Sequence, residues 1–145
     1  MGRGVQEEIM LILPKDIYEI YREYEQDPTD GKFRPNLVVF VDEDDVYCLP
    51  ITGSSPNDPP RHKGDYWKVG IEEWREIPLK KKSWIVINQA KIVDREDIEN
   101  AKYIGPLQED DWIKVIEKTE EYEKCLEQIK NTRSVRSKNN RTTNT

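Results

Sequence analysis

Residues 33–55, FRPNLVVFVDEDDVYCLPITGSS, contain the pattern that decides the expected fold. Two apolar runs rich in β-branched residues, at 37–41 and 46–51, flank four consecutive acidic residues at 42–45. Because unpaired carboxylates are costly to bury, the acidic stretch is expected to form an exposed turn. Two such runs joined by a short polar link are typical of a β-hairpin.

The two far ends of this hairpin carry polar groups of complementary chemistry. Arg34 precedes the first apolar run, and Thr52 follows the second, together with Gly53, Ser54 and Ser55. A guanidinium group donates two hydrogen bonds to a phosphate, and a turn rich in backbone N–H groups binds anions. The sequence therefore predicts a phosphate-binding site where the two strands end.

The length of 145 residues fits one domain, which we expect over residues 1–131, followed by a disordered basic tail over residues 132–145. No apolar run is long enough to span a membrane. The apolar run at 9–13 is too short for a signal peptide and follows two acidic residues. The sequence therefore predicts a cytoplasmic protein.

The expected fold class is α+β, mainly β: a small antiparallel β-structure with a helix at each side. Apolar residues at helical spacing predict a short amphipathic helix over residues 15–26. Three acidic residues at 109–111 followed by an apolar stripe to residue 129 predict a long C-terminal helix. Trp67, Trp74 and Trp84 are expected to pack in the core, although tryptophans can also stack on bases.

Basic residues gather at two places in an otherwise acidic chain. The segment 53–65 contains three prolines, two glycines and the basic run Arg61, His62 and Lys63, which fits a binding loop or a solvated surface loop. A second basic run, Lys80, Lys81 and Lys82, precedes Ser83. Without residues 130–145, which hold five basic residues and no acid, 18 basic and 29 acidic residues give the body a net charge of −11, which repels nucleic acid at long range. An RNA site would therefore have to be a local basic patch.

Several common catalytic patterns are absent from the sequence. It has no Cys/His cluster for zinc, no calcium-loop spacing, no phosphate-binding loop and no dinucleotide fingerprint. The chain has one histidine and no Gly-x-Ser-x-Gly motif, which argues against a hydrolase triad. We therefore expect no cofactor and no metal site.

The order of the pieces, however, resembles a known family. Arg34-Pro35 opens a strand, a second strand ends in Ile51-Thr52-Gly53-Ser54-Ser55, and Ser83 opens a later strand before Ile104-Gly105-Pro106-Leu107 and a terminal helix. This arrangement resembles the MazF/PemK toxin endoribonucleases of bacterial toxin–antitoxin systems over roughly residues 33–125. The resemblance implies an SH3-like β-barrel, a homodimer and metal-independent cleavage of single-stranded RNA to a 2′,3′-cyclic phosphate.

The resemblance also implies roles for individual residues. The catalytic arginine and threonine of the family fall on Arg34 and Thr52, and a family serine falls on Ser83. The chemistry of the remaining polar residues agrees with binding of an RNA backbone, and His62 has a pKa range suited to proton transfer. The expected substrate-binding residues are Gly53, Ser54, Ser55, Arg61, His62, Lys63, Lys80, Lys81, Lys82 and Ser83.

Two other interpretations remain open at this stage. A non-catalytic barrel that binds a protein or peptide would suit the acidic surface better than RNA does. A related toxin neutralised by an RNA antitoxin would share the barrel, and a helix over residues 15–26 would fit it. The cognate antitoxin is therefore expected to be a protein or, less readily, an RNA.

Overall fold

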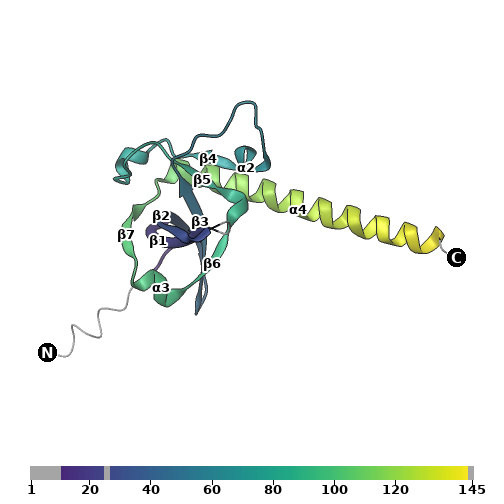
Figure 1. The fold of residues 1–145 in the computed structure, drawn as a ribbon, viewed down its shortest axis with the longest axis horizontal. Helices are drawn as coiled ribbons and strands as arrows, with labels where there is room; N and C mark the ends of the chain where they lie inside the picture. Colours follow the sequence, from purple (N-terminus) through teal and green to yellow (C-terminus); the bar gives the residue numbers. More distant parts are fainter. Residues whose placement is uncertain (1–10, 25–26, 144–145) are drawn as a thin grey trace.

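The computed structural model describes residues 11–24 and 27–143, with side chains described at 11–21 and 32–132. It has seven strands, and short helical segments connect the later ones (Figure 1). The elements are β1 (Asp16–Tyr24), β2 (Asp27–Val41), β3 (Asp45–Thr52), α2 (Lys63–Tyr66), β4 (Lys68–Gly70), η1 (Trp74–Glu76), β5 (Trp84–Val86), η2 (Ile87–Gln89), β6 (Lys91–Asp94), α3 (Arg95–Glu99), β7 (Lys102–Pro106) and α4 (Glu109–Thr143).

The hairpin predicted from the sequence is confirmed. Strands β2 and β3 pair antiparallel, with Asn36 opposite Pro50 and Val41 opposite Val46. The acidic link is a turn, in which the Asp42 N–H donates to the Asp45 carbonyl oxygen over 2.8 Å. Strand β2 is longer than expected, because it begins well before the apolar run.

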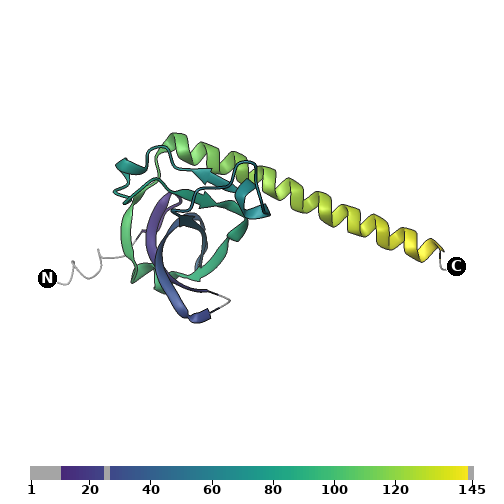
Figure 2. The ribbon, with the colours of Figure 1, turned by 45° about the horizontal axis from the view of Figure 1, so that its top comes forward.

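The strands form one curved antiparallel sheet with the order β4-β5-β3-β2-β1-β7, and β6 also pairs with β3. Figure 2 shows these strands curving around a common interior. Among the described residues no pairing joins the end strands β4 and β7, so the sheet is not closed. The mainly antiparallel architecture is as expected, whereas a closed SH3-like barrel is not confirmed.

The prediction of a helix over residues 15–26 is wrong, because this segment contains strand β1. Lys15 has a φ of 81°, outside the right-handed helical region, and β1 then pairs with β2 on one side and β7 on the other. Ile17 and Tyr18 are both buried, although neighbouring strand residues point to opposite faces. A strand buried on both faces loses the alternation that distinguishes it from a helix.

The two faces of β1 belong to two separate apolar clusters. Ile17 lies in the larger cluster, which β4, β5 and α4 cover and which contains Trp67 and Val115. Tyr18 and Ile20 lie in the smaller cluster, which is covered by β6 and α3. Strands β1, β2 and β3 contribute to both clusters, so they form the middle layer of the domain.

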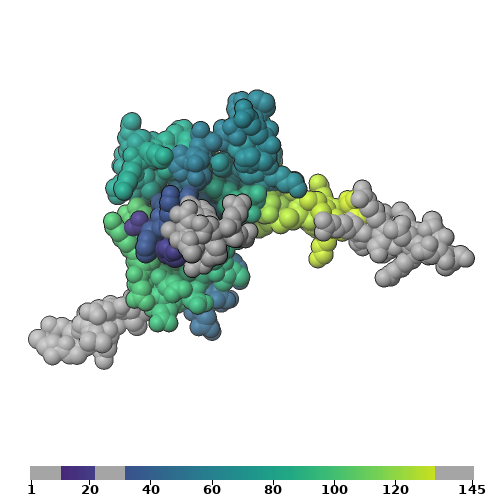
Figure 3. Space-filling model, in the orientation of Figure 1, coloured from purple at the N-terminus to yellow at the C-terminus, as the bar shows by residue number. Residues whose placement is uncertain are grey.

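The long C-terminal helix is confirmed as α4, and it extends further than predicted. Trp112, Val115, Tyr122 and Cys125 pack against the larger cluster, whereas Leu126 and Ile129 are half exposed. Beyond this contact the helix projects away from the body (Figures 1 and 3). Its backbone continues through residues 132–143, where a disordered tail was expected. No proline or glycine follows Pro106, and extending a nucleated helix is far less costly than starting one.

No helix within the described ranges is long and apolar enough to cross a lipid bilayer.

The first prediction concerns the projecting end of α4. Deleting residues 132–145 should change the melting temperature by little, because the packed side chains of α4 end at Cys125 in the described part of the helix. A thermal melt followed by circular dichroism measures this directly. A fall of several degrees would mean that the deleted segment contributes packing to the folded domain.

The second prediction concerns Tyr18, which is 1% exposed. Burial, with Asp16 and Tyr103 nearby, raises the pKa of Tyr18 to about 12. The unfolded chain loses this proton near pH 10, so the stability that Tyr18 contributes is present below pH 10 and is lost as the pH rises toward 12. Tyr18→Phe should therefore flatten the fall in unfolding free energy between pH 10 and 12.

Urea unfolding at several alkaline pH values measures this effect, and Tyr21→Phe is the matched control because that side chain is 44% exposed. The assignment is wrong if Tyr18→Phe and wild type lose stability in parallel over this range.

Candidate functional site

Arg34 lies midway along β2, and Thr52 is the last residue of the neighbouring strand β3. Asn36 pairs with Pro50, so the same register places Arg34 across from Thr52. Both residues line one open groove of ≈ 920 Å³. We call it the Arg34 groove, and its polar lining includes Arg34, Thr52, Ser54, His62, Lys68 and Lys91.

The turn after β3 fixes the Thr52 hydroxyl. Its Oγ1 accepts a hydrogen bond from the Ser54 N–H at 3.2 Å, the pattern of a turn closed by a threonine side chain. Within the described residues no acceptor takes the hydroxyl hydrogen, so Thr52 can donate it to a ligand. On the opposite strand, the Asn36 side-chain amide donates to the Arg34 carbonyl oxygen at 2.9 Å and holds that backbone.

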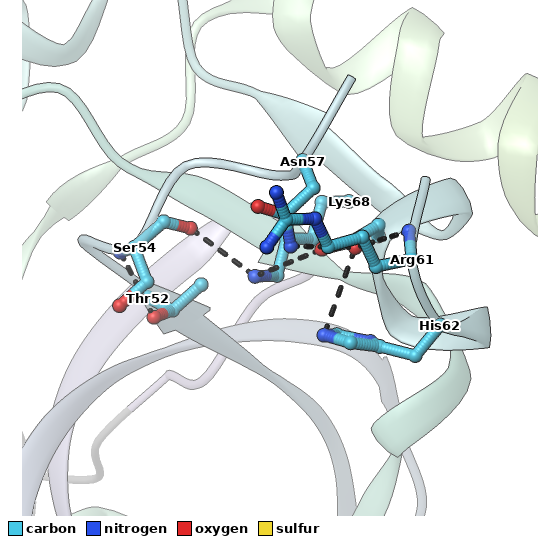
Figure 4. A network of polar contacts seen from close by, with 7 residues as sticks. Thr52, Ser54, Asn57, Arg61, His62 and Lys68 are labelled. Atoms are coloured by element: carbon cyan, nitrogen blue, oxygen red, sulfur yellow. Dashed lines mark hydrogen bonds and ion pairs between the residues drawn. The ribbon is translucent and has the colours of Figure 1, made fainter. Parts of the chain in front are cut away.

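The loop between β3 and α2 is held by the buried carboxylate of Asp65, which belongs to α2. Figure 4 shows the surrounding residues Asn57, Arg61, His62 and Lys68. Asp65 Oδ2 accepts one hydrogen bond from Asn57 Nδ2 and one from the Arg61 N–H, both at 3.0 Å. The hydrogen bond from Asn57 is the largest influence on the pKa of Asp65 and lowers it, and the hydrogen bond from the Arg61 N–H lowers it further. Together they outweigh burial, which raises the pKa, and hold it well below its usual range. The carboxylate therefore stays charged and ties the loop together.

Two basic side chains lie beside this carboxylate at the groove. His62 Nε2 lies 3.6 Å from Asp65 Oδ2, and the imidazole is largely exposed. Lys68 Nζ lies 3.9 Å from Asp65 Oδ1 and donates to the Ser54 carbonyl oxygen at 3.2 Å. Figure 4 shows Lys68 reaching from β4 toward the turn that carries Thr52 and Ser54.

A second groove of ≈ 400 Å³ lies on the other side of the β3 end, and Ile51 lines both grooves. We call it the Lys81 groove; among its lining residues are Gly53, Lys80, Lys81, Ser83, Lys102 and Tyr103. The Lys81 side chain lies against Gly53, where an added Cβ would come within 2.2 Å of Lys81 Cε. The Ser83 hydroxyl donates to the Lys81 carbonyl oxygen at 3.0 Å.

The structure thus divides the predicted site residues. Arg34, Thr52, Ser54 and His62 share the Arg34 groove, whereas Gly53, Lys80, Lys81 and Ser83 share the adjoining one. Lys82 instead pairs with Glu72 at 3.4 Å and lies over the Trp84 ring. The predicted site residues that line neither groove are Ser55, Arg61, Lys63 and Lys82.

Sequence reasoning missed Asp65, Lys68 and Lys91. Asp65 ends a polar loop in the sequence, and an acidic residue at such a position is normally expected to be exposed to solvent. Lys68 and Lys91 begin two short strands, β4 and β6, whose positions in the sheet depend on pairings that no local pattern encodes. Alternation within these strands is too short to show which side chains face the site.

Within the described ranges, no three histidine, cysteine or acidic side chains lie close enough together to hold a metal ion.

Comparison with known proteins identifies the family. The family model described as "PemK-like, MazF-like toxin of type II toxin-antitoxin system" matches residues 14–121, most of the chain. Among solved structures, the chain is similar to one from the MazE–MazF crystal structure (Form III) of Deinococcus radiodurans, with a TM-score of 0.55 and 14% identity. The match covers 76% of this chain and 94% of that one. No curated protein matches the chain.

The matched region begins before β1 and ends within α4, so it contains all seven strands and both grooves. The structural likeness shows the same fold, and the family match extends the resemblance seen in the sequence back to residue 14. The chain belongs to the PemK-like, MazF-like toxin family of type II toxin–antitoxin systems.

Proposed function

We propose that the protein is an endoribonuclease toxin that cleaves single-stranded RNA by attack of a ribose 2′-hydroxyl on the adjacent phosphate. The observation that carries this proposal is the convergence of Arg34 and Thr52 in one groove. These two residues come from the neighbouring strands β2 and β3, and they match the catalytic pair that the family resemblance implies. The products would be a 2′,3′-cyclic phosphate and a 5′-hydroxyl.

The two side chains suit the charge that develops in this reaction. Attack by the 2′-oxygen forms a new P–O bond and increases negative charge on the non-bridging oxygens of the phosphate. The Arg34 guanidinium can donate two hydrogen bonds to those oxygens, and the Thr52 hydroxyl can add a third. The P–O bond to the 5′-oxygen then breaks, and no water is consumed in this step.

Proton transfer requires a base near the 2′-hydroxyl and an acid near the leaving 5′-oxygen. His62 is a candidate for either role because it lines the groove that also contains Arg34 and Thr52. Its exposed imidazole has the adjacent Asp65 carboxylate as a partner. We assign His62 to proton transfer in this proposal, and the remaining steps depend on Arg34 and Thr52.

Local cations offset the repulsion between RNA and the acidic body. Lys68 and Lys91 line the Arg34 groove, and Lys80, Lys81 and Lys102 line the adjoining groove. The two grooves meet at the end of β3, so one strand of RNA can cross that end and contact both. Exposed Phe33 and Tyr103 line the second groove and offer faces for base stacking.

The family assigns the expected partners. Its members belong to type II toxin–antitoxin systems, and the similar solved structure is named as a MazE–MazF assembly. We propose a cognate protein antitoxin, a homodimer and action in the cytoplasm. The type II assignment disfavours an RNA antitoxin, and a non-catalytic binding domain remains the second candidate because the body is strongly acidic.

The third prediction tests the catalytic pair. Arg34→Ala should lower single-turnover cleavage of a labelled RNA pool by at least ~100-fold, because it removes one preorganised stabiliser of the phosphate charge. Arg34→Lys should rescue little, since an ammonium does not reproduce the two-pronged geometry. Thr52→Val keeps the shape of the side chain and should also fall sharply in rate.

Arg75→Ala is the control for Arg34→Ala, because Arg75 is exposed and stacks on Trp74 away from both grooves. All four variants should keep the melting temperature of the wild type within a few degrees. If folded Arg34→Ala cuts RNA at the wild-type rate, the catalytic assignment fails and the binding domain becomes the better account.

The fourth prediction concerns metal ions. Attack by the internal 2′-hydroxyl needs no metal-activated water, so cleavage should continue unchanged in excess chelator. Rates are compared in chelator, in magnesium and in manganese with the same RNA pool. Loss of cleavage in chelator that magnesium restores would contradict the proposed chemistry.

A further inference from the structure

The buried carboxylate of Asp65 has an unusual place at the rim of the Arg34 groove. Its side chain is 1% exposed, although a carboxylate is rarely fully buried without strong partners. Two hydrogen bonds reach its Oδ2, whereas its Oδ1 accepts none among the described residues. The nearest cation to Oδ1 is Lys68 Nζ at 3.9 Å, an ion pair without a hydrogen bond.

Lys68 is confined in the same way. Its side chain is 13% exposed, although lysine normally keeps its ammonium group in water. One of its three N–H donors is taken by the Ser54 carbonyl oxygen at 3.2 Å. In the described part of the chain no other hydrogen bond uses this ammonium, and the side chain lines the Arg34 groove. It therefore keeps donors for a ligand in that groove.

We infer that Lys68 binds a phosphate group of the substrate in the Arg34 groove and that Asp65 is the residue that positions it. This inference rests on the proposed function and adds a binding residue to the pair Arg34 and Thr52. A flexible lysine loses considerable side-chain entropy when it binds an anion. Asp65 and the Ser54 carbonyl oxygen hold the ammonium before RNA arrives, so less of that entropy is lost on binding.

A purely structural role for the pair makes a different prediction. If Lys68 only neutralises the buried carboxylate, its removal lowers the melting temperature but leaves the number of phosphate contacts unchanged. The salt dependence of RNA binding separates the two roles, because each phosphate contact adds about 0.7 to the slope of log affinity against log salt for a single strand.

The experiment measures binding of a labelled 2′-O-methyl RNA pool, which lacks the attacking hydroxyl, over a series of salt concentrations. Lys68→Met should weaken binding at low salt and reduce the slope by about 0.7. Lys68→Arg keeps the charge and should restore most of the slope. Lys114→Met removes the same charge from an exposed position on α4 and should leave the slope unchanged.

Asp65 is tested through its coupling to Lys68. Asp65→Asn should weaken RNA binding in the wild-type background and have little further effect when Lys68 is already methionine. If Lys68→Met alone fails to fold, the double variant replaces it, because removing both charges together leaves no unpaired buried charge. The salt slope of the double variant is then compared with that of Asp65→Asn.

The outcomes distinguish this inference from the proposed function. Wild type that neither binds nor cuts RNA overturns the proposed function and this inference with it. Wild type that cuts RNA, with Lys68→Met at the wild-type slope, overturns the inference alone. Additive effects of the two substitutions on binding would show that Asp65 does not act through Lys68.

Discussion

The register between β2 and β3 is the constraint on which the candidate site depends. It places Arg34 across from Thr52, and a slip of one residue would turn every side chain of one strand to the opposite face. The slip is prevented by burial on both faces of each strand: Leu37 and Leu49 enter the larger apolar cluster, and Val38 and Cys48 enter the smaller one. The packing that stabilises the fold therefore also sets the geometry of the site.

Under the proposed function, electrostatics impose a second constraint, because the acidic body would have to present a local basic surface to RNA. Several lysines line the two grooves, and two of them have defined contacts there. Lys68 is held beside buried Asp65, and Lys81 lies against the backbone of Gly53. Aromatic contacts from α4 reach the same region, where the rings of Tyr122 and Trp67 meet edge-on with centroids 4.8 Å apart and Lys118 lies over the Tyr66 ring. The helix thus supports the loop and strand that carry the cations.

The hairpin and the convergence of Arg34 with Thr52 were predictable from the sequence because both depend on neighbouring residues: a polar link of four acids between two β-branched runs. The strand β1 was not predictable, because burial of Ile17, Tyr18 and Ile20 on two faces removes the period-two alternation and leaves a spacing that mimics a helix. Lys68 was missed for a related reason, since its place in the groove follows from the pairing of short β4 with β5. The sequence-based prediction ended α4 too early. The polar composition of the last residues shows that they cannot bury a core, but it does not show whether a helix that has already started continues through them.

The central claim of the proposed function is that a phosphate of the RNA backbone is held between the end of β3 and the middle of β2. A crystal structure of the protein with a bound 2′-O-methyl oligoribonucleotide tests it most directly. The account predicts one backbone phosphate within hydrogen-bonding distance of both the Arg34 guanidinium and Thr52 Oγ1. An oligonucleotide bound on another face, with no phosphate touching either side chain, would contradict the account.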